Sequence, residues 1–203
     1  MPYQSTDRLR CLFSLSDCRL QPPVFADILT RCQTLLADIP PYDEQTGQGI
    51  LRHLFLRRGY HSGEIMLCFV TAKDIALQLT TIGMQLMQEF PDLVSVMQNV
   101  NAKRTNVILG QETSCLCGKD TISDTLCGIP VTLSPQSFYQ VNTAQAERLF
   151  TEAKRLGNPQ PHELLLDLYC GAGAIGLSMA DSARKVIGVE IVPQAVEDAK
   201  KTA

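Results

Sequence analysis

The stretch LLLDLYCGAGAIGL, residues 164–177, decides the fold of this chain. An apolar run ends at Asp167 and passes through a glycine-rich loop into a helix-forming segment. A second strand pattern follows at 185–191, and a second helix pattern begins at Pro193. Strand, helix, strand and helix in this order predict a βαβ unit with two parallel strands. We therefore expect an α/β fold in which residues 136–203 form the first portion of a Rossmann-like domain.

Residues 1–135 carry a different pattern, which predicts an α+β central domain with mostly antiparallel strands. Helices are expected at 22–41 and about 76–90. Strands are expected on both sides of the turn YHSG at 60–63, at LVSVMQNVN (93–101), at TNVILG (105–110) and in short runs within 114–134. A further helix is expected to begin at Asn142, an N-cap residue with Gln145 as its capping-box partner, and to end at Gly157.

Composition places the chain among globular proteins, with 203 residues, 45% hydrophobic residues and a net charge of −3. No apolar run reaches the roughly 18 residues of a membrane span, and the N-terminus lacks the apolar core of a signal peptide. Eight cysteines without a secretory signal indicate a reducing compartment. We therefore expect a cytoplasmic protein with no membrane partner, and the oligomeric state is left open.

The loop itself matches G-x-G-x-x-G, a pattern shared by dinucleotide sites and S-adenosylmethionine (AdoMet) sites. Gly171 and Gly173 allow the backbone to approach a ligand, and Glu190 at the end of the next strand suits ribose hydroxyls. Asp167 would repel a pyrophosphate but attract the sulfonium and ammonium groups of AdoMet. The residues therefore favour AdoMet over a dinucleotide or a turn without a ligand.

Three segments resemble consecutive motifs of the AdoMet-dependent RNA uracil-5 methyltransferases. They are SPQSFYQVN (134–142), LLLDLYCGAGAIGLSMA (164–180) and VIGVEIVPQAVEDAKKTA (186–203). Residues 46–71 and 93–110 are similar to the central domain of that family, and the likeness is strongest to the bacterial 23S ribosomal RNA branch. The resemblance implies transfer of a methyl group from AdoMet to C5 of a uridine in RNA, with ribosomal RNA as the partner.

The same resemblance implies a cofactor set. Gln140 would bind AdoMet through its amide, Tyr169 would pack near it, and Glu190 would hold the ribose hydroxyls. Gly171 and Gly173 would form the floor of the site.

In this family a cysteine adds to C6 of uracil and a carboxylate base later removes the C5 proton. Both residues come after the second βα unit in the family, so we assign no catalytic residue here, and Cys170 belongs to the cofactor loop. We expect the chain to be part of a longer enzyme, and we expect the 203-residue chain by itself to be inactive. The alternatives are a non-catalytic RNA- or AdoMet-binding remnant and, from another class, a dinucleotide-dependent oxidoreductase.

Many family members carry an iron–sulfur cluster held by four cysteines, and Cys18 resembles the fourth ligand. The other three ligands have no counterpart here, so we expect no cluster in this chain. Cys115 and Cys117 do not match a zinc pattern, and no metal is expected there.

Two local basic segments are candidates for RNA contact. One is the first strand of the hairpin, with Arg52, Arg57 and Arg58, and the other carries Lys103 and Asn106. Guanidinium groups suit phosphates and amides suit base edges. The alternative is an ordinary solvated hairpin face.

Overall fold

The computed structural model describes residues 21–203. These residues fall into two compact units, the first ending at Asp38 and the second covering Ile39–Ala203. In the first unit, α1 (Pro23–Leu35) begins at a proline and buries Phe25, Ile28 and Cys32 at three-to-four spacing. This confirms the helix expected over 22–41, although the helix ends at Leu35, six residues earlier than expected. Cys18 lies outside the described residues.

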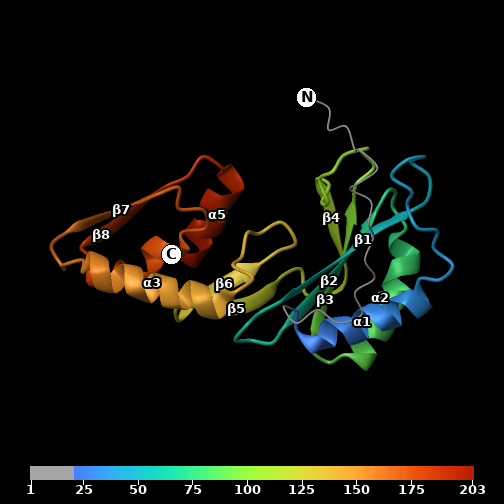
Figure 1. Cartoon of the computed structure of the whole chain (residues 1–203), viewed down its shortest axis with the longest axis horizontal. Coiled ribbons are helices and arrows are strands. Elements are labelled where there is room, and N and C mark those ends of the chain that lie inside the picture. Colours follow the sequence, from blue (N-terminus) through green and yellow to red (C-terminus); the bar gives the residue numbers. More distant parts are fainter. Residues whose placement is uncertain (1–20) are drawn as a thin grey trace, which may run out of the picture. The chain divides into compact units, whose positions relative to one another are not determined.

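The second unit begins with a four-stranded sheet in the order β1-β2-β3-β4 (Figure 1). The strands are β1 (Leu51–Arg58), β2 (Ile65–Thr71), β3 (Leu93–Val100) and β4 (Glu112–Gly118). β1 and β2 form the expected antiparallel hairpin, and β3 and β4 are also antiparallel. β2 and β3 are parallel because α2 (Ala76–Glu89) carries the chain back across the sheet. All seven residues of β2 are buried, so this strand is the centre of the core.

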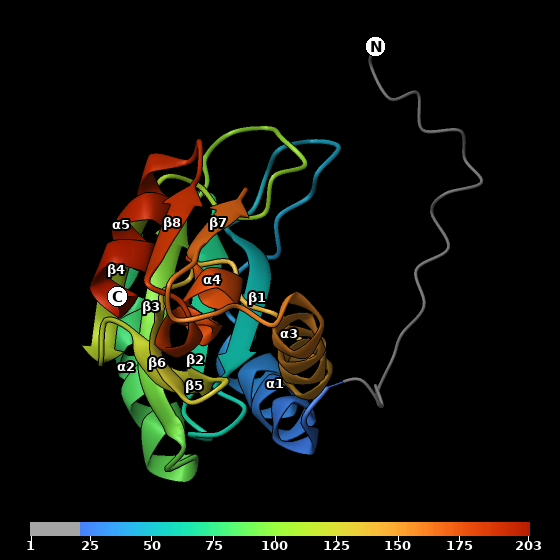
Figure 2. The same cartoon turned by 90° about the vertical axis from the view of Figure 1, so that its left-hand side faces the viewer.

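Helix α2 runs along the sheet beside β3 and β4 (Figure 1, Figure 2). A Cβ at Gly83 would lie 2.9 Å from both Cys117 Sγ and Val96 Cγ1. The absence of a side chain at Gly83 therefore sets how closely the helix packs on the sheet.

The prediction of a strand at 105–110 is wrong. Residues 101–111 form a loop, which we call the 101–111 loop, and Val107 and Ile108 are about half exposed on it. Buried side chains hold its backbone in place of a strand ladder: Asn99 Nδ2 donates to the Gly110 carbonyl, and Asn101 Nδ2 donates to the Val107 carbonyl.

A second hairpin, β5 (Ile122–Leu126) and β6 (Ile129–Leu133), packs on one face of the sheet. Its turn residues Cys127 and Gly128 both have positive φ, 52° and 79°. Two positive φ values are typical of the tight type I′ hairpin turn. Ile122 and Leu133 join Met66, Cys68 and Met97 in one buried cluster.

The remaining chain forms the βαβ unit that the sequence predicts. Its elements are α3 (Thr143–Gly157), β7 (Leu164–Leu168), α4 (Ala174–Ser178), the 3-10 turn η2 (Ala180–Ser182), β8 (Lys185–Val189) and α5 (Pro193–Thr202). β7 and β8 are parallel and lie side by side (Figure 1). Asn142 caps α3 as expected, since its Oδ1 accepts the Gln145 N–H at 3.3 Å. The left-handed residue at the other end is Asn158 rather than Gly157.

This architecture confirms the α/β fold. A domain boundary near residue 135 stays a prediction. The outer residues of β7 are open to solvent, since Leu164, Leu166 and Leu168 are 51, 54 and 56% exposed. Within residues 21–203, no helix is long and apolar enough to cross a membrane.

Candidate cofactor site

The loop between β7 and α4 alternates between ordinary and left-handed backbone. Tyr169, Gly171 and Gly173 have φ of 61°, 55° and 82°. Glycine adopts this conformation freely, but a tyrosine held there costs about 1–3 kcal/mol. Strained residues of this kind concentrate at ligand sites. The Tyr169 side chain is 89% exposed, so its conformation is set by the loop and not by burial of its ring.

Asp167 fixes the start of α4. Its Oδ2 accepts the Gly176 N–H at 2.8 Å, which satisfies one of the free donors of the first helical turn. A Cβ on residue 176 would lie 2.8 Å from the same oxygen, so a glycine is required for this approach. The hydrogen bond from Gly176 to the strand-end carboxylate of Asp167 therefore depends on a glycine at the third position of the motif.

Glu190 fixes the other side of the loop. Its Oε2 accepts the Gly171 N–H at 2.9 Å, and its Oε1 accepts the N–H groups of Ile191 and Val192 at 2.7 and 2.9 Å. These backbone donors, that of Val192 foremost, hold the pKa of Glu190 below its ordinary value. A carboxylate has about four acceptor positions, so these three hydrogen bonds leave about one acceptor position of Glu190 unused.

A cavity of about 250 Å³ opens beside this loop. Gln140, Tyr169 and Gly171 line it together, so the structure brings these three predicted cofactor residues to one place. Asp167, Gly173 and Glu190 do not line it, and Asp167 and Glu190 support the loop instead. Gln140 is exposed, and its side-chain amide makes no hydrogen bond to the described residues.

The cavity has an apolar wall that the sequence did not predict. It comes from the β5–β6 hairpin, α3 and the start of α4, through Leu126, Ile129, Val131, Phe150 and Ile175. Apolar walls with a few polar groups are typical of small-ligand sites.

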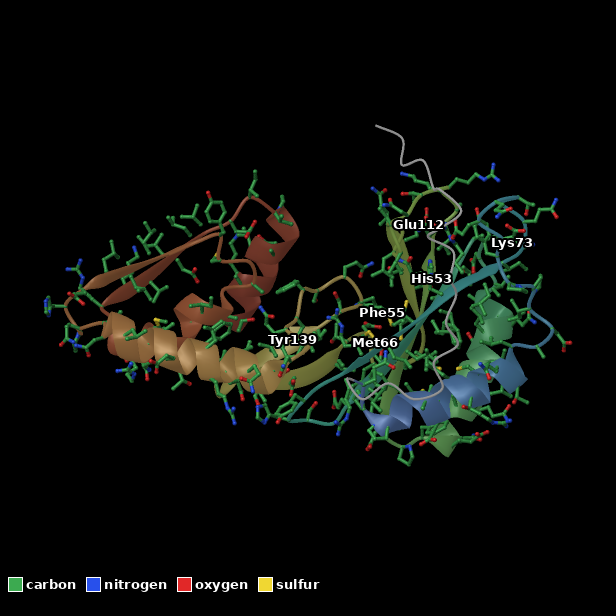
Figure 3. All side chains as sticks on the ribbon, viewed as in Figure 1. His53, Phe55, Met66, Lys73, Glu112 and Tyr139 are labelled. Atoms are coloured by element: carbon green, nitrogen blue, oxygen red, sulfur yellow. The ribbon has the colours of Figure 1, made fainter. Side chains whose placement is uncertain are left out.

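Asp124 and Tyr139 position the segment that carries Gln140. The Tyr139 hydroxyl donates to Asp124 Oδ2 at 2.5 Å, and Tyr139 packs in the cluster that contains Phe55 and Met66 (Figure 3). Burial and the Asp124 carboxylate raise the pKa of the Tyr139 phenol, so it remains a donor. Asp124 is 4% exposed. Sequence reasoning missed this pair; the one signal is that Asp124 alternates with Ile122 and Leu126, so that it lies on the buried face of β5.

The same carboxylate holds the turn between β1 and β2. The backbone N–H groups of Tyr60, His61 and Ser62 donate to Asp124 at 2.7, 2.9 and 3.1 Å. Burial alone would raise the pKa of Asp124, but the Tyr139 hydroxyl and these backbone donors together lower it below its ordinary value. Asp124 is therefore ionised and ties this turn to the Gln140 segment.

The predicted RNA residues lie at two ends of the sheet. Arg52 is the second residue of β1 and lies beside the 101–111 loop, whereas Arg58 is the last residue, at the other end of the same strand. Six steps of about 3.3 Å each along the extended strand place the two residues about 20 Å apart. Lys103 and Asn106 are exposed on the 101–111 loop. The structure does not gather the five residues into one patch.

Arg52 differs from the others because its side chain is only 1% exposed. It donates to the carbonyls of Asn101, Lys103 and Thr105 at 2.8, 2.7 and 3.2 Å. It also pairs with Glu44 at 3.0 Å and lies over the Tyr42 ring at 4.5 Å. In this structure Arg52 holds the 101–111 loop and is not open to a phosphate.

The side chain of Arg57 is also partly buried. Its guanidinium lies 5.4 Å from the centre of the Phe55 ring, and its Nη1 is buried with no hydrogen bond to the described residues. Burial lowers the pKa of Arg57. Arg58 is exposed.

The pKa values of the described cysteine thiols are all raised. Burial raises the pKa of Cys32 and Cys68 to about 12. The pKa values of the other four are also raised, first by burial: Cys115, Cys117, Cys127 and Cys170. For Cys170, the carboxylates of Asp167 and Glu190 add to the effect. The thiolate is the reactive form of cysteine, and the absence of a catalytic role for Cys170 stays a prediction. Within residues 21–203 no cluster of metal-binding side chains is found.

The fold places the chain among Rossmann-like α/β proteins. Residues 85–203 match the family model "tRNA (Uracil-5-)-methyltransferase". The chain belongs to this family, which confirms the resemblance seen in its sequence.

Relatives and a solved structure agree with this assignment. The chain is 38% identical over 194 residues to an uncharacterized RNA methyltransferase of Staphylococcus aureus, covering 95% of this chain and 43% of that protein. It is 39% identical to an uncharacterized RNA methyltransferase of Streptococcus agalactiae with the same coverage. It is also similar to the crystal structure of Pyrococcus abyssi tRNA (uracil-54, C5)-methyltransferase in complex with S-adenosyl-L-homocysteine. That match has a TM-score of 0.76 and 24% identity and covers 94% of this chain and 46% of the other, so it supports the fold. The chain spans less than half the length of these relatives.

Proposed function

We propose that this chain supplies the AdoMet-binding and RNA-contacting parts of an enzyme that methylates C5 of a uridine in RNA. We further propose that the RNA is 23S ribosomal RNA, that the enzyme works in the cytoplasm, and that residues 1–135 and 136–203 act as separate domains. The observation that carries the proposal is the meeting of Gln140, Tyr169 and Gly171 at one cavity beside the glycine loop.

Charge supports AdoMet as the ligand of that cavity. The carboxylates of Asp167 and Glu190 hold the backbone of the loop, and among the described side chains no lysine or arginine lines the cavity. A pyrophosphate would meet unfavourable charge there, whereas a sulfonium and an ammonium group would be stabilised. The crystal structure similar to this chain contains S-adenosyl-L-homocysteine, which is AdoMet without its transferred methyl group.

Carbon 5 of uracil becomes nucleophilic enough to take a methyl group only after a nucleophile adds at C6. The resemblance to the family puts both the nucleophile and the base beyond the second βα unit, so none of the six described cysteines is assigned that role. We therefore propose that the nucleophile and the base come from residues outside this chain, and that the chain alone binds AdoMet and RNA without forming 5-methyluridine.

An RNA-modification assay tests the proposal. The chain is joined to the C-terminal part of the S. aureus relative, and the chimera is incubated with AdoMet and either 23S ribosomal RNA or tRNA. Nucleosides are then analysed by mass spectrometry. We expect 5-methyluridine in the ribosomal RNA, none with the 203-residue chain alone, and a loss of product with Gln140→Ala in the chimera.

The outcomes separate the parts of the proposal. Product in tRNA alone would overturn the ribosomal assignment and keep the chemistry. A methyl group on another atom, or 5-methyluridine formed by the 203-residue chain alone, would contradict the proposed division of labour.

A further inference from the structure

The turn between β1 and β2 presents an aromatic ring on a fixed backbone. We call residues 58–63 the hairpin tip. Tyr60 is 51% exposed there, although three successive N–H groups of the same turn donate to the buried carboxylate of Asp124. Surface loops are ordinarily mobile. Here three charge-assisted hydrogen bonds hold the backbone of the hairpin tip in place.

His61 adds a second anchor. Its Nε2 lies 2.9 Å from Glu147 Oε1 on α3, and its ring meets the Tyr60 ring edge-on at 4.9 Å and 89°. Glu147 Oε1 also accepts the Cys127 N–H at 2.9 Å. The Tyr60 ring is therefore supported on one side while about half of its surface stays open.

Arg58 supplies an unneutralised positive charge at the same tip. It is exposed, and its Nη2 lies 3.6 Å from where a Cβ on Gly63 would stand, so the guanidinium lies alongside the turn. The neighbouring carboxylate of Glu64 is already paired with Lys119. Among residues 21–203, Arg58 has no carboxylate partner, in contrast to Arg52.

We infer that the hairpin tip is a stacking platform for one unpaired nucleobase of the RNA, with Arg58 on the adjoining phosphate. The inference rests on the proposed RNA substrate and adds a site to it. An open aromatic ring beside an arginine is the usual way in which proteins hold unstacked bases. A uracil that leaves its stack to reach a buried cofactor leaves neighbouring bases without partners.

The platform and the cofactor cavity belong to one connected set of contacts. Asp124 binds the hairpin tip through three N–H groups and Tyr139 through its hydroxyl, and Tyr139 lines the cavity next to Gln140. A base held on Tyr60 is thereby placed at a fixed distance from the cavity. The occupant is unpaired RNA rather than duplex, because the base faces of a duplex are hidden by stacking.

Fluorescence anisotropy with a labelled RNA stem-loop tests the platform on the whole 203-residue chain. We expect Tyr60→Ala to weaken binding about five- to 150-fold, the range measured when an aromatic that stacks on a base is lost. Tyr60→Phe keeps the ring and should bind within about twofold of the unchanged chain. Arg58→Ala should lower the slope of log affinity against log salt by about 0.7. Leu77→Ala, an 89% exposed side chain on α2, is the control and should change nothing.

A fully paired duplex of the same length separates stacking from general charge. Tyr60→Ala should leave the weaker duplex binding unchanged. If the folded Tyr60→Ala chain binds the stem-loop as tightly as the unchanged chain does, or weakens loop and duplex equally, the platform is wrong and the proposed function stands. If the unchanged chain binds no RNA, both are wrong.

Discussion

Replacing Asp124 by Asn should lower the free energy of unfolding by about 2–4 kcal/mol. Asp124 accepts four hydrogen bonds, from the N–H groups of Tyr60, His61 and Ser62 and from the Tyr139 hydroxyl. Each bond to a charged group contributes about 1.5–3 kcal/mol, but the three N–H groups sit on an exposed turn and regain water when released. The sum of four bonds therefore overstates the loss, and asparagine keeps one acceptor oxygen.

Urea denaturation followed by circular dichroism measures this loss. Asp92→Asn is the matched control, because Asp92 is exposed and its side chain makes no hydrogen bond to the described residues. We expect Asp92→Asn to change stability by less than about 0.5 kcal/mol. A loss below about 1 kcal/mol for Asp124→Asn would refute the reasoning, since it is smaller than one charged hydrogen bond.

The effect of pH provides a second check. The folded pKa of Asp124 is lowered from its ordinary value, so its contribution is complete above the unfolded value of about 3.9. The contribution is lost as the pH falls through the lower folded pKa. The stability difference between the unchanged chain and Asp124→Asn should therefore be constant from neutral pH to about 5 and shrink below about 4. A difference that persists unchanged to the acid limit would contradict an ionic origin.

Three further outcomes follow from the contacts. Arg52→Met should cost about 1–3 kcal/mol, because the part-buried carbonyls of Asn101 and Thr105 lose their donor, and should speed amide exchange in the 101–111 loop; unchanged exchange would contradict the role of Arg52 in holding that loop. Gly176→Ala should lower the melting temperature, costing about 1–3 kcal/mol, because its Cβ would meet Asp167 Oδ2 at 2.8 Å; no change would show that α4 is free to shift. Cys68 should resist iodoacetamide at pH 8 in the folded chain and react in urea, because burial raises its pKa to about 12; rapid modification detected by mass spectrometry in the folded state would contradict that burial.

The second half of the chain could be predicted because its signals are local. The apolar run before Asp167, the glycines at 171 and 173 and the proline at 193 each specify one element over a few residues. Those elements form with nearly the expected bounds, and the glycines have the positive φ for which glycine is used.

The first half contains contacts that no local pattern predicts. Val107 and Ile108 give 105–110 the composition of a strand, but Arg52, some 50 residues earlier, holds this backbone as a loop. The same contacts bury the Arg52 side chain. Its position among basic residues had suggested an exposed side chain in contact with RNA. Asp124 lies 62–64 residues from the turn that it binds. Pairings of this kind depend on the sheet register, which brings distant polar groups together only after folding.

Calorimetric titration of the 203-residue chain with AdoMet tests the central claim most directly. We predict saturable binding, about tenfold or more weaker for Gln140→Ala, because the amide would lose a charge-assisted hydrogen bond. Gln136→Ala should bind as the unchanged chain does, since Gln136 does not line the cavity. NAD should give no binding. Binding of NAD without binding of AdoMet, or AdoMet binding that is insensitive to Gln140→Ala, would contradict the account.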